Sequence, residues 1–234
     1  AALAVSGKVD RVDGWLHDGK LYLRVVDYKT GKKSFDLTDI RYGLGIQMLL
    51  YLFTLEREGP DYFGYPVVPC GVLYQPARDV ILRQDRNITD EKLKTALRGA
   101  LRRTGLVLDE PQVLYAMEHS ALESPCYLPI GVKKDGSLSG DLASAAQLGH
   151  LGRYVDRLLH QITGEIARGN IDADPYTRGP QDSACTHCAF ASACYFDESR
   201  DRRRLLNKTD KDAFWALMET EYGEEGHHGG GIDN

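Results

Sequence analysis

The stretch GKVDRVDGWLHDGKLYLRVVDYKTG, residues 7–31, holds two strand-like runs on either side of an Asp-Gly pair. Residues 5–15 and 20–28 alternate in polarity or run apolar, and HDGK (17–20) separates them. Asp-Gly between two such runs is the strongest short-range signal for a β-hairpin. The stretch therefore predicts an antiparallel hairpin with Asp18 and Gly19 as its turn residues.

This turn predicts which side chains share a face of the hairpin. Opposed residues lie equally far from the turn, so Asp10 is expected opposite Asp27, with Cβ atoms about 4.5–5.5 Å apart. Lys29 follows Asp27 by two residues and projects on the same face. Two carboxylates so close destabilise each other unless a cation lies between them. The hairpin thus predicts two carboxylates and an ammonium converging at one point.

Asp13 competes with Asp10 for the role of second carboxylate. It has the opposite parity, so it falls on the other face, opposite Arg24, where we expect a surface ion pair. A bulge in the hairpin would reverse this choice.

A divalent cation bridging Asp10 and Asp27 would relieve their repulsion. Mg²⁺ takes oxygen ligands and keeps several waters, which suits a site with few protein groups. Such a site, with Lys29 holding a water or stabilising developing charge, could hydrolyse a phosphodiester. The simpler alternative is a surface hairpin with a salt bridge.

The rest of the sequence predicts an α/β domain. We expect a buried helix over 38–57 capped by Thr38 or Asp39, strands at 69–77 and 79–84, and a helix over 90–103. Residues 107–142 read as strand pieces and loops, 143–168 as a long amphipathic helix, and 209–222 as a last helix. Within the first helix, Gln47 and Tyr51 share one face, either as core residues or beside the metal site.

Composition sets limits on the function. Hydrophobic residues make up 42% of the 234, enough for a core, and no apolar run of membrane-spanning length occurs. The net charge of −5 does not indicate a nucleic-acid binder, although basic residues cluster near 29–33, 92–103 and 200–204. There is no signal-peptide pattern, and the strand-like start without Met suggests a fragment of a longer protein.

Three motifs together resemble one family. GKVDRVDGW, VVDYKTG and GLGIQMLLYLF resemble the Asp…Asp-x-Lys…Gln-x-x-x-Tyr motifs of RecB-type PD-(D/E)XK nucleases. PYTRGPQDSACTHCAFASACYFD (175–197) is similar to the cysteine segment of AddB-like subunits of helicase–nucleases. The resemblance spans roughly residues 5–198 and implies a restriction-endonuclease-like fold, a mixed β-sheet flanked by helices.

The resemblance implies roles for single residues. Asp10, Asp27 and the Tyr28 carbonyl would hold Mg²⁺ or Mn²⁺, Lys29 would be the catalytic lysine, and Gln47 and Tyr51 the accessory pair. The family has a further helix, often with another ligand, that would precede residue 1. Thr30, Lys32 and Lys33 are the weaker candidates for DNA contacts.

Cys185, Cys188 and Cys194 form a C-x2-C-x5-C cluster, whereas Cys70 and Cys126 stand apart. Three close thiols suggest a metal, and zinc would need a fourth ligand such as the nearby His187. The resemblance instead implies a [4Fe–4S] cluster completed by an upstream cysteine, which would leave the site incomplete within this chain. Plain thiols remain the third alternative.

The resemblance implies a nuclease domain over 1–198, a helical extension over 199–222 and a tail over 223–234. The expected activity is Mg²⁺-dependent cleavage of single-stranded DNA from a duplex end, alongside an AddA-like helicase subunit in the bacterial cytoplasm. The alternatives are a stand-alone RecB-like exonuclease of the CRISPR-adaptation type, or a non-catalytic DNA-end clamp of the same fold.

Overall fold

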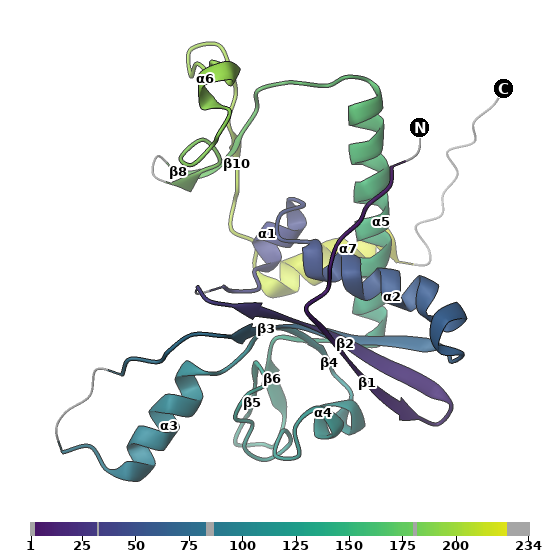
Figure 1. Ribbon diagram of the computed structural model, residues 1–234, viewed down its shortest axis with the longest axis vertical. Helices are drawn as coiled ribbons and strands as arrows, with labels where there is room; N and C mark the ends of the chain where they lie inside the picture. The colour runs from purple at the N-terminus through teal and green to yellow at the C-terminus, as the bar shows by residue number, and fades with distance from the viewer. Residues whose placement is uncertain (1–2, 32, 83–86, 180–181, 224–234) are drawn as a thin grey trace. The chain divides into compact units, whose positions relative to one another are not determined.

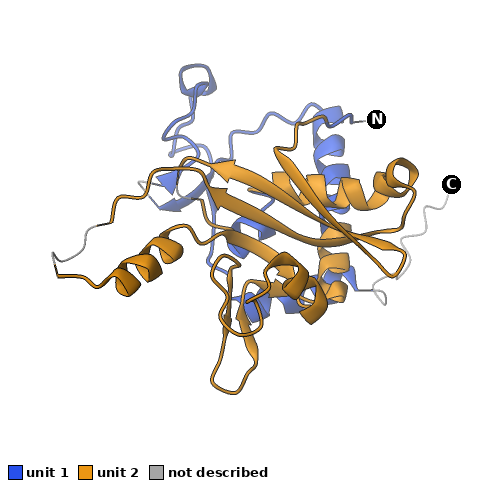
Figure 2. Ribbon diagram, turned by 60° about the horizontal axis from the view of Figure 1, so that its bottom comes forward, with its two compact units in different colours: residues 1–5, 36–44, 154–234 blue, residues 6–35, 45–153 orange. Residues whose placement is uncertain are grey.

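The computed structural model describes residues 3–31, 33–82, 87–179 and 182–223 (Figure 1). The chain forms two compact units (Figure 2), of which unit 1 comprises residues 1–5, 36–44 and 154–234, and unit 2 comprises residues 6–35 and 45–153. The division falls within the long helix α5 (Ala145–Ala167). The domain boundary expected at residue 198 stays a prediction.

Unit 2 is built on a five-stranded mixed sheet in the order β1-β2-β3-β4-β7. The strands are β1 (Arg11–His17), β2 (Lys20–Lys29), β3 (Val67–Pro76), β4 (Thr104–Leu108) and β7 (Leu142–Ala143). β1–β2 and β3–β4 pair antiparallel, whereas β2–β3 and β4–β7 pair parallel. The expected mixed α/β architecture is therefore confirmed.

Both faces of this sheet are covered, which explains why β2 and β3 carry consecutive apolar residues. Val26 and Leu73 face a cluster that includes Leu114 of α4 (Pro111–Met117) and Ile130 of β5 (Ile130–Val132). The alternate side chains, such as Val25, point to the opposite face, where α2 (Gln47–Phe63) packs on β2 and β3. Figure 1 shows α2 on one side of the sheet, and α4 and the β5–β6 hairpin (β6, Leu138–Gly140) on the other.

The single helix predicted over 38–57 is wrong, because two helices occupy this region. α1 (Leu37–Arg41) ends before Gly43, and α2 begins at Gln47. Gly43 and Gly45 have φ angles of 76° and 66°, left-handed values that no α-helix can continue through. The predicted cap is also placed too late in the chain, since Asp36 is the N-cap and accepts from the Thr38 amide at 2.8 Å.

Two other local predictions need correction. Residues 79–82 form no strand, and the end of that expected strand lies outside the described residues. The region 107–142 holds a helix, α4, which was not expected; Pro111 at its first position is a typical helix start. By contrast, α3 (Asp90–Ala100), capped by Thr89, confirms the helix predicted over 90–103.

Glu118 organises the loop that follows α4. Its carboxylate accepts hydrogen bonds from the amides of Cys126, Tyr127 and Leu128, at 2.6, 3.1 and 3.0 Å. Burial by itself would raise the pKa of Glu118, but these amide hydrogen bonds outweigh it and lower the pKa below its ordinary value. The charged carboxylate therefore stabilises this loop above the carboxylate's pKa, and its contribution is lost as the pH falls through that pKa.

Unit 1 gathers α1, the end of α5 and α7 (Lys211–Tyr222) with a small three-stranded sheet. That sheet contains β8 (Tyr176–Gly179), β9 (Asp182–Ser183) and β10 (Arg204–Leu205), and α6 (Ala191–Cys194) lies between β9 and β10 in the chain. The Tyr154 hydroxyl donates to the Ile40 carbonyl at 2.7 Å, and Arg178 pairs with Asp39. α5 and α7 confirm the helices predicted over 143–168 and 209–222.

None of the helices in the described ranges combines the length and apolar character needed to cross a bilayer.

Candidate active site

The β1–β2 hairpin has the predicted turn and register. Asp18 and Gly19 have φ angles of 47° and 73°, as a two-residue hairpin turn with two positive φ values requires. Pairing runs without a shift from His17↔Lys20 to Arg11↔Val26. The one irregularity of β2 lies on its other edge, against β3, so it does not change the parity of β1. The next pair outward in this register is Asp10 with Asp27.

Asp27 projects on the same face as Val25, the face of the sheet that α2 covers, and Asp10 lies next to it, one residue beyond the last pair of the ladder. Asp10 lies just before β1, and its carboxylate accepts a hydrogen bond from the Tyr28 amide at 3.1 Å. The Tyr28 ring points to the opposite face, where its hydroxyl accepts from Arg11 at 3.1 Å. The side chain of Asp27 is only 13% exposed, whereas Asp10 is exposed. One carboxylate is therefore sheltered and the other is open to solvent.

Lys29 lies against Asp27, with 2.6 Å between Nζ and Oδ2. The same ammonium lies 5.7 Å from the centre of the Tyr74 ring, which is opposite Asp27 on β3. Burial, and then the charge of Asp27, raises the pKa of Tyr74 above its ordinary value. The Tyr74 side chain therefore stays uncharged beside the Asp27–Lys29 ion pair.

The donor set fits a hard divalent cation. Asp27 Oδ2 is buried and, within the described residues, contacts the Lys29 charge without receiving a hydrogen bond of good geometry. The Lys29 ammonium offsets the charge of this buried oxygen, so a bound divalent cation would have to share or take that position. No group of three His, Cys, Asp or Glu side chains in the described parts of the chain could hold a metal. A metal here would accordingly rest on two carboxylates, with carbonyl or water oxygens as the other ligands.

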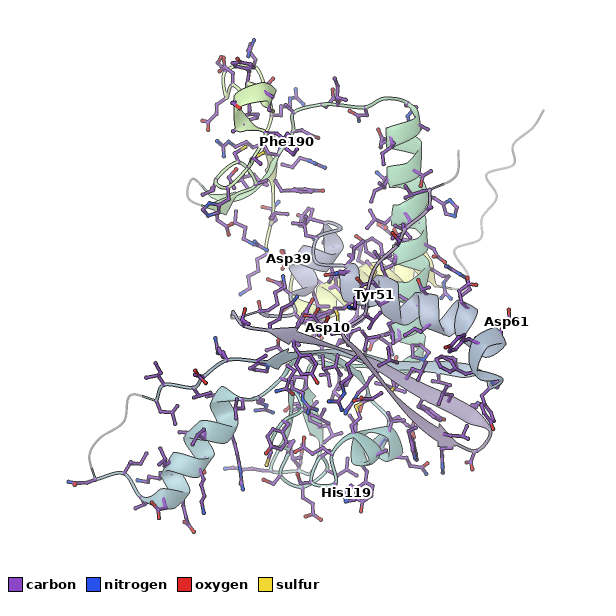
Figure 3. The ribbon with its side chains drawn as sticks, in the orientation of Figure 1. Asp10, Asp39, Tyr51, Asp61, His119 and Phe190 are labelled. Atoms are coloured by element: carbon purple, nitrogen blue, oxygen red, sulfur yellow. The ribbon has the colours of Figure 1, made fainter. Side chains whose placement is uncertain are left out.

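Gln47 and Tyr51 lie together on the first turns of α2. Gln47 Nε2 donates to the Tyr51 hydroxyl at 2.9 Å, as their spacing predicts. The Tyr51 ring packs against Gly7, three residues before Asp10, so closely that a Cβ at position 7 would lie 2.6 Å from the hydroxyl oxygen. In the view of Figure 3, Asp10 lies near Tyr51, which belongs to α2. Gly7 is thus a close neighbour of the candidate residue Tyr51 that no sequence pattern indicated.

Asp13 has the separate role expected of it. Arg24 donates to its carboxylate at 2.9 Å and Arg11 at 2.6 Å, on the face away from Asp10. Burial would raise the pKa of Asp13, but the hydrogen bonds from Arg11 and Arg24 lower it below its ordinary value. The predicted Asp13–Arg24 pair is confirmed, although it is more buried than a surface pair, since the Arg24 side chain is 12% exposed.

Comparison with known families decides the relationship. The sequence profile of the PD-(D/E)XK nuclease superfamily matches residues 2–195. The chain belongs to this superfamily. Its members are generally metal-dependent nucleases, and the fold and the Asp27-Tyr28-Lys29 strand end described above agree with that membership.

Individual relatives are larger proteins. This superfamily member is 36% identical to an ATP-dependent helicase/deoxyribonuclease subunit of Acetivibrio thermocellus over 93% of the chain, and 34% identical to its counterpart in Clostridium acetobutylicum over 97%. A protein of the same name from Desulforudis audaxviator is 34% identical over 96%. The chain spans about a fifth of the length of these curated relatives.

The candidate DNA contacts of this PD-(D/E)XK chain lie just after the Asp-x-Lys strand. Thr30 and Lys33 are exposed, and Lys32 lies outside the described residues. Lys33 lines the same surface hollow as Lys29.

The three clustered cysteines lie in unit 1 of this nuclease-superfamily chain. Cys188 donates its amide to the Cys185 carbonyl at 3.3 Å, and Cys194 ends the short helix α6. All three are free thiols, and within the described ranges they do not gather into a metal-holding group. Burial raises the pKa of Cys70 to about 12, so this thiol is a poor thiolate ligand.

Proposed function

We propose that this chain is the nuclease module of a helicase–nuclease subunit and hydrolyses phosphodiester bonds of single-stranded DNA with Mg²⁺ or Mn²⁺. The observation that carries the proposal is the hairpin register, which if continued by one residue sets Asp10 opposite Asp27, with Lys29 in contact with Asp27. The names of the relatives support deoxyribonuclease activity and a multi-subunit helicase–nuclease, in which we take the partner to be an AddA-like helicase subunit.

In this proposal each residue acts from its observed position. Asp10 and Asp27, with the Tyr28 carbonyl, would hold the cation, which when bound supplies Lewis-acid chemistry to a phosphate oxygen and to water. Lys29 orients the attacking water and donates a hydrogen bond where negative charge develops on phosphorus oxygens. Gln47 and Tyr51 position the DNA strand beside Asp10. Because Asp27 holds the Lys29 ammonium at 2.6 Å, the lysine already lies beside the position where the cation would bind.

A pair of matched substitutions in the full-length protein with its helicase partner tests the choice of carboxylate. Asp10→Asn is expected to reduce Mg²⁺-dependent cleavage of a labelled single strand by more than about 100-fold, because it removes a metal ligand. Asp13→Asn, on the opposite face of the hairpin, is expected to retain cleavage within about threefold, because the asparagine side-chain oxygen can still accept a hydrogen bond from Arg24. The reverse outcome, with Asp13→Asn inactive and Asp10→Asn active, would show that the assignment is wrong.

We further propose that Cys185, Cys188 and Cys194 bind three corners of a [4Fe–4S] cluster in the full-length protein. The spacing of the thiols and their position after β9 support this, and a fourth thiolate would have to come from another part of that protein. The described residues do not form a complete set of cluster ligands by themselves.

Anaerobically purified full-length protein is expected to contain iron and acid-labile sulfide and to absorb broadly in the visible range. Cys188→Ser should remove this absorbance, while Cys126→Ser, outside the cluster, should leave it unchanged. A colourless protein that contains zinc would overturn the cluster in favour of the zinc alternative.

A further inference from the structure

A basic hollow opens beside the candidate active site in unit 2. It measures about 480 Å³ and is lined in part by Lys29, Lys33, Arg78 and Arg102. None of the described lining residues is acidic. Lys29 belongs to both the candidate active site and the hollow, so the hollow begins where the proposed cleavage occurs.

The cations come from three separate parts of the fold. Lys33 follows β2, Arg78 follows β3, and Arg102 lies between α3 and β4. Lys33, Arg78 and Arg102 make no ion pair with a carboxylate among the described residues; Arg102 only donates Nε to the Leu128 carbonyl, at 2.8 Å. A cleft lined by one sign of charge focuses its potential and attracts the opposite charge. These cations are therefore available to an anionic ligand.

The backbone around the hollow is held in place and is accessible. The Thr104 hydroxyl donates to the Lys33 carbonyl at 2.8 Å, and the Ala77 amide donates to the Lys29 carbonyl at 2.9 Å. Gly31 and Gly99 line the hollow, and a Cβ at either would meet nothing within 4 Å. A bulky ligand backbone can thus approach the main chain at both glycines.

The end of α3 opposes anion binding only weakly. A helix C-terminus carries partial negative charge, which weakly disfavours a nearby anion. Here the amides of Leu101 and Arg102 already bond to carbonyls of this last turn. Lys33, Arg78 and Arg102, which form no ion pair among the described residues, outweigh that effect.

We propose that this hollow binds the sugar-phosphate backbone of the DNA strand next to the scissile bond, with Lys33, Arg78 and Arg102 as phosphate contacts. The inference rests on the proposed nuclease function and adds the path of the substrate strand. Unlike the candidates Thr30 and Lys32, Arg78 and Arg102 lie far from the Asp-x-Lys motif in sequence, and only folding brings them beside Lys29.

Photo-crosslinking in the full-length protein with its partner tests the path directly. We expect p-benzoylphenylalanine in place of Ser34, an exposed lining residue, to crosslink a labelled single-stranded oligonucleotide in the presence of EDTA. The same probe in place of Lys94, exposed on α3 but outside the lining, should not crosslink. Absence of a crosslink at position 34, or equal crosslinks at both positions, would overturn the proposal.

A kinetic comparison measures the contribution of the charges. The Lys33→Ala/Arg78→Ala double variant is expected to raise the KM for a single-stranded oligonucleotide by about 25-fold at 0.1 M salt. Each phosphate contact with a single strand releases about 0.7 counterions, so losing two contacts lowers the affinity by a factor of about 0.1 raised to the power −1.4. Its kcat should stay within about threefold of wild type. Lys92→Ala/Lys94→Ala changes the charge equally and should leave KM unchanged. Equal KM values in both double variants would contradict the proposed path.

The two proposals fail in different ways. Crosslinking at position 34 without any cleavage by wild-type protein would retain the path and reject the nuclease function. Cleavage that depends on Lys29, without a crosslink or a KM effect, would retain the function and reject the path.

Discussion

Replacing Lys29 with alanine is expected to reduce Mg²⁺-dependent cleavage of single-stranded DNA by about 10²–10⁴-fold. Lys29 is the cation closest to the buried Asp27 oxygen, and no other ammonium lies within ion-pair distance of Asp27 in the described parts of the chain. The measurement is a single-turnover rate with the full-length protein and its helicase partner. Lys20→Ala, at the turn end of the same hairpin, is the matched control and should cleave as wild type does.

Asp27→Ala and the Asp27→Ala/Lys29→Ala double variant extend this test. Groups that act as a unit show strongly non-additive losses, so the double variant is expected to be little slower than either single variant. If all three variants degrade DNA as fast as wild type, the active-site assignment is wrong. If even the wild-type protein does not cleave, a non-catalytic DNA-end clamp becomes the better explanation of the fold.

Replacing Gly105 with alanine is expected to destabilise unit 2 by more than about 3 kcal/mol. Gly105 lies on β4 with φ at 152°, and a Cβ there would lie 2.0 Å from the Val72 carbonyl oxygen of β3. That oxygen is backbone in the centre of the sheet, so it cannot move aside without disturbing the β3–β4 pairing. Urea denaturation followed by circular dichroism measures the loss.

Gly99→Ala is the control for this substitution. Gly99 is exposed on α3, and an added Cβ there meets nothing within 4 Å. Alanine should leave stability unchanged or raise it by about 0.5–1 kcal/mol, since it restricts the unfolded chain and favours the helix. Equal effects at positions 99 and 105 would mean that the close approach of β3 and β4 at Gly105 does not limit stability.

The carboxylate pair could be predicted because it depends on local geometry. An Asp-Gly turn with positive φ at both residues leaves one register for the hairpin, and strand alternation then separates Asp10 from Asp13. The Gln47–Tyr51 contact is equally local, since one helical turn joins the two residues. The assignment of Asp10 and Asp27 as metal ligands, and of Gln47 and Tyr51 as accessory residues, remains a prediction.

The break between α1 and α2 shows where local patterns mislead. The apolar residues of 38–57 continue across Gly43 and Gly45 and would surround most of a helix axis, so hydrophobicity alone joins the two helices. The two glycines carried the contrary signal, because each can adopt the left-handed backbone that ends a helix. α4 was missed for a related reason, as its seven residues are too few to show a clear period.

The sequence by itself determined the hairpin, the face that Asp27 and Lys29 share, and the helices α3, α5 and α7, since each follows from spacing within one short segment. Only the tertiary structure decided that β3 lies between β2 and β4, that Gly7 meets Tyr51, and that Arg78 and Arg102 line the same hollow as Lys29. Contacts between distant segments depend on how the strands pair and how both faces of the sheet are packed. Strand pairing and face packing depend on how much apolar surface the whole unit buries, and no single segment determines that.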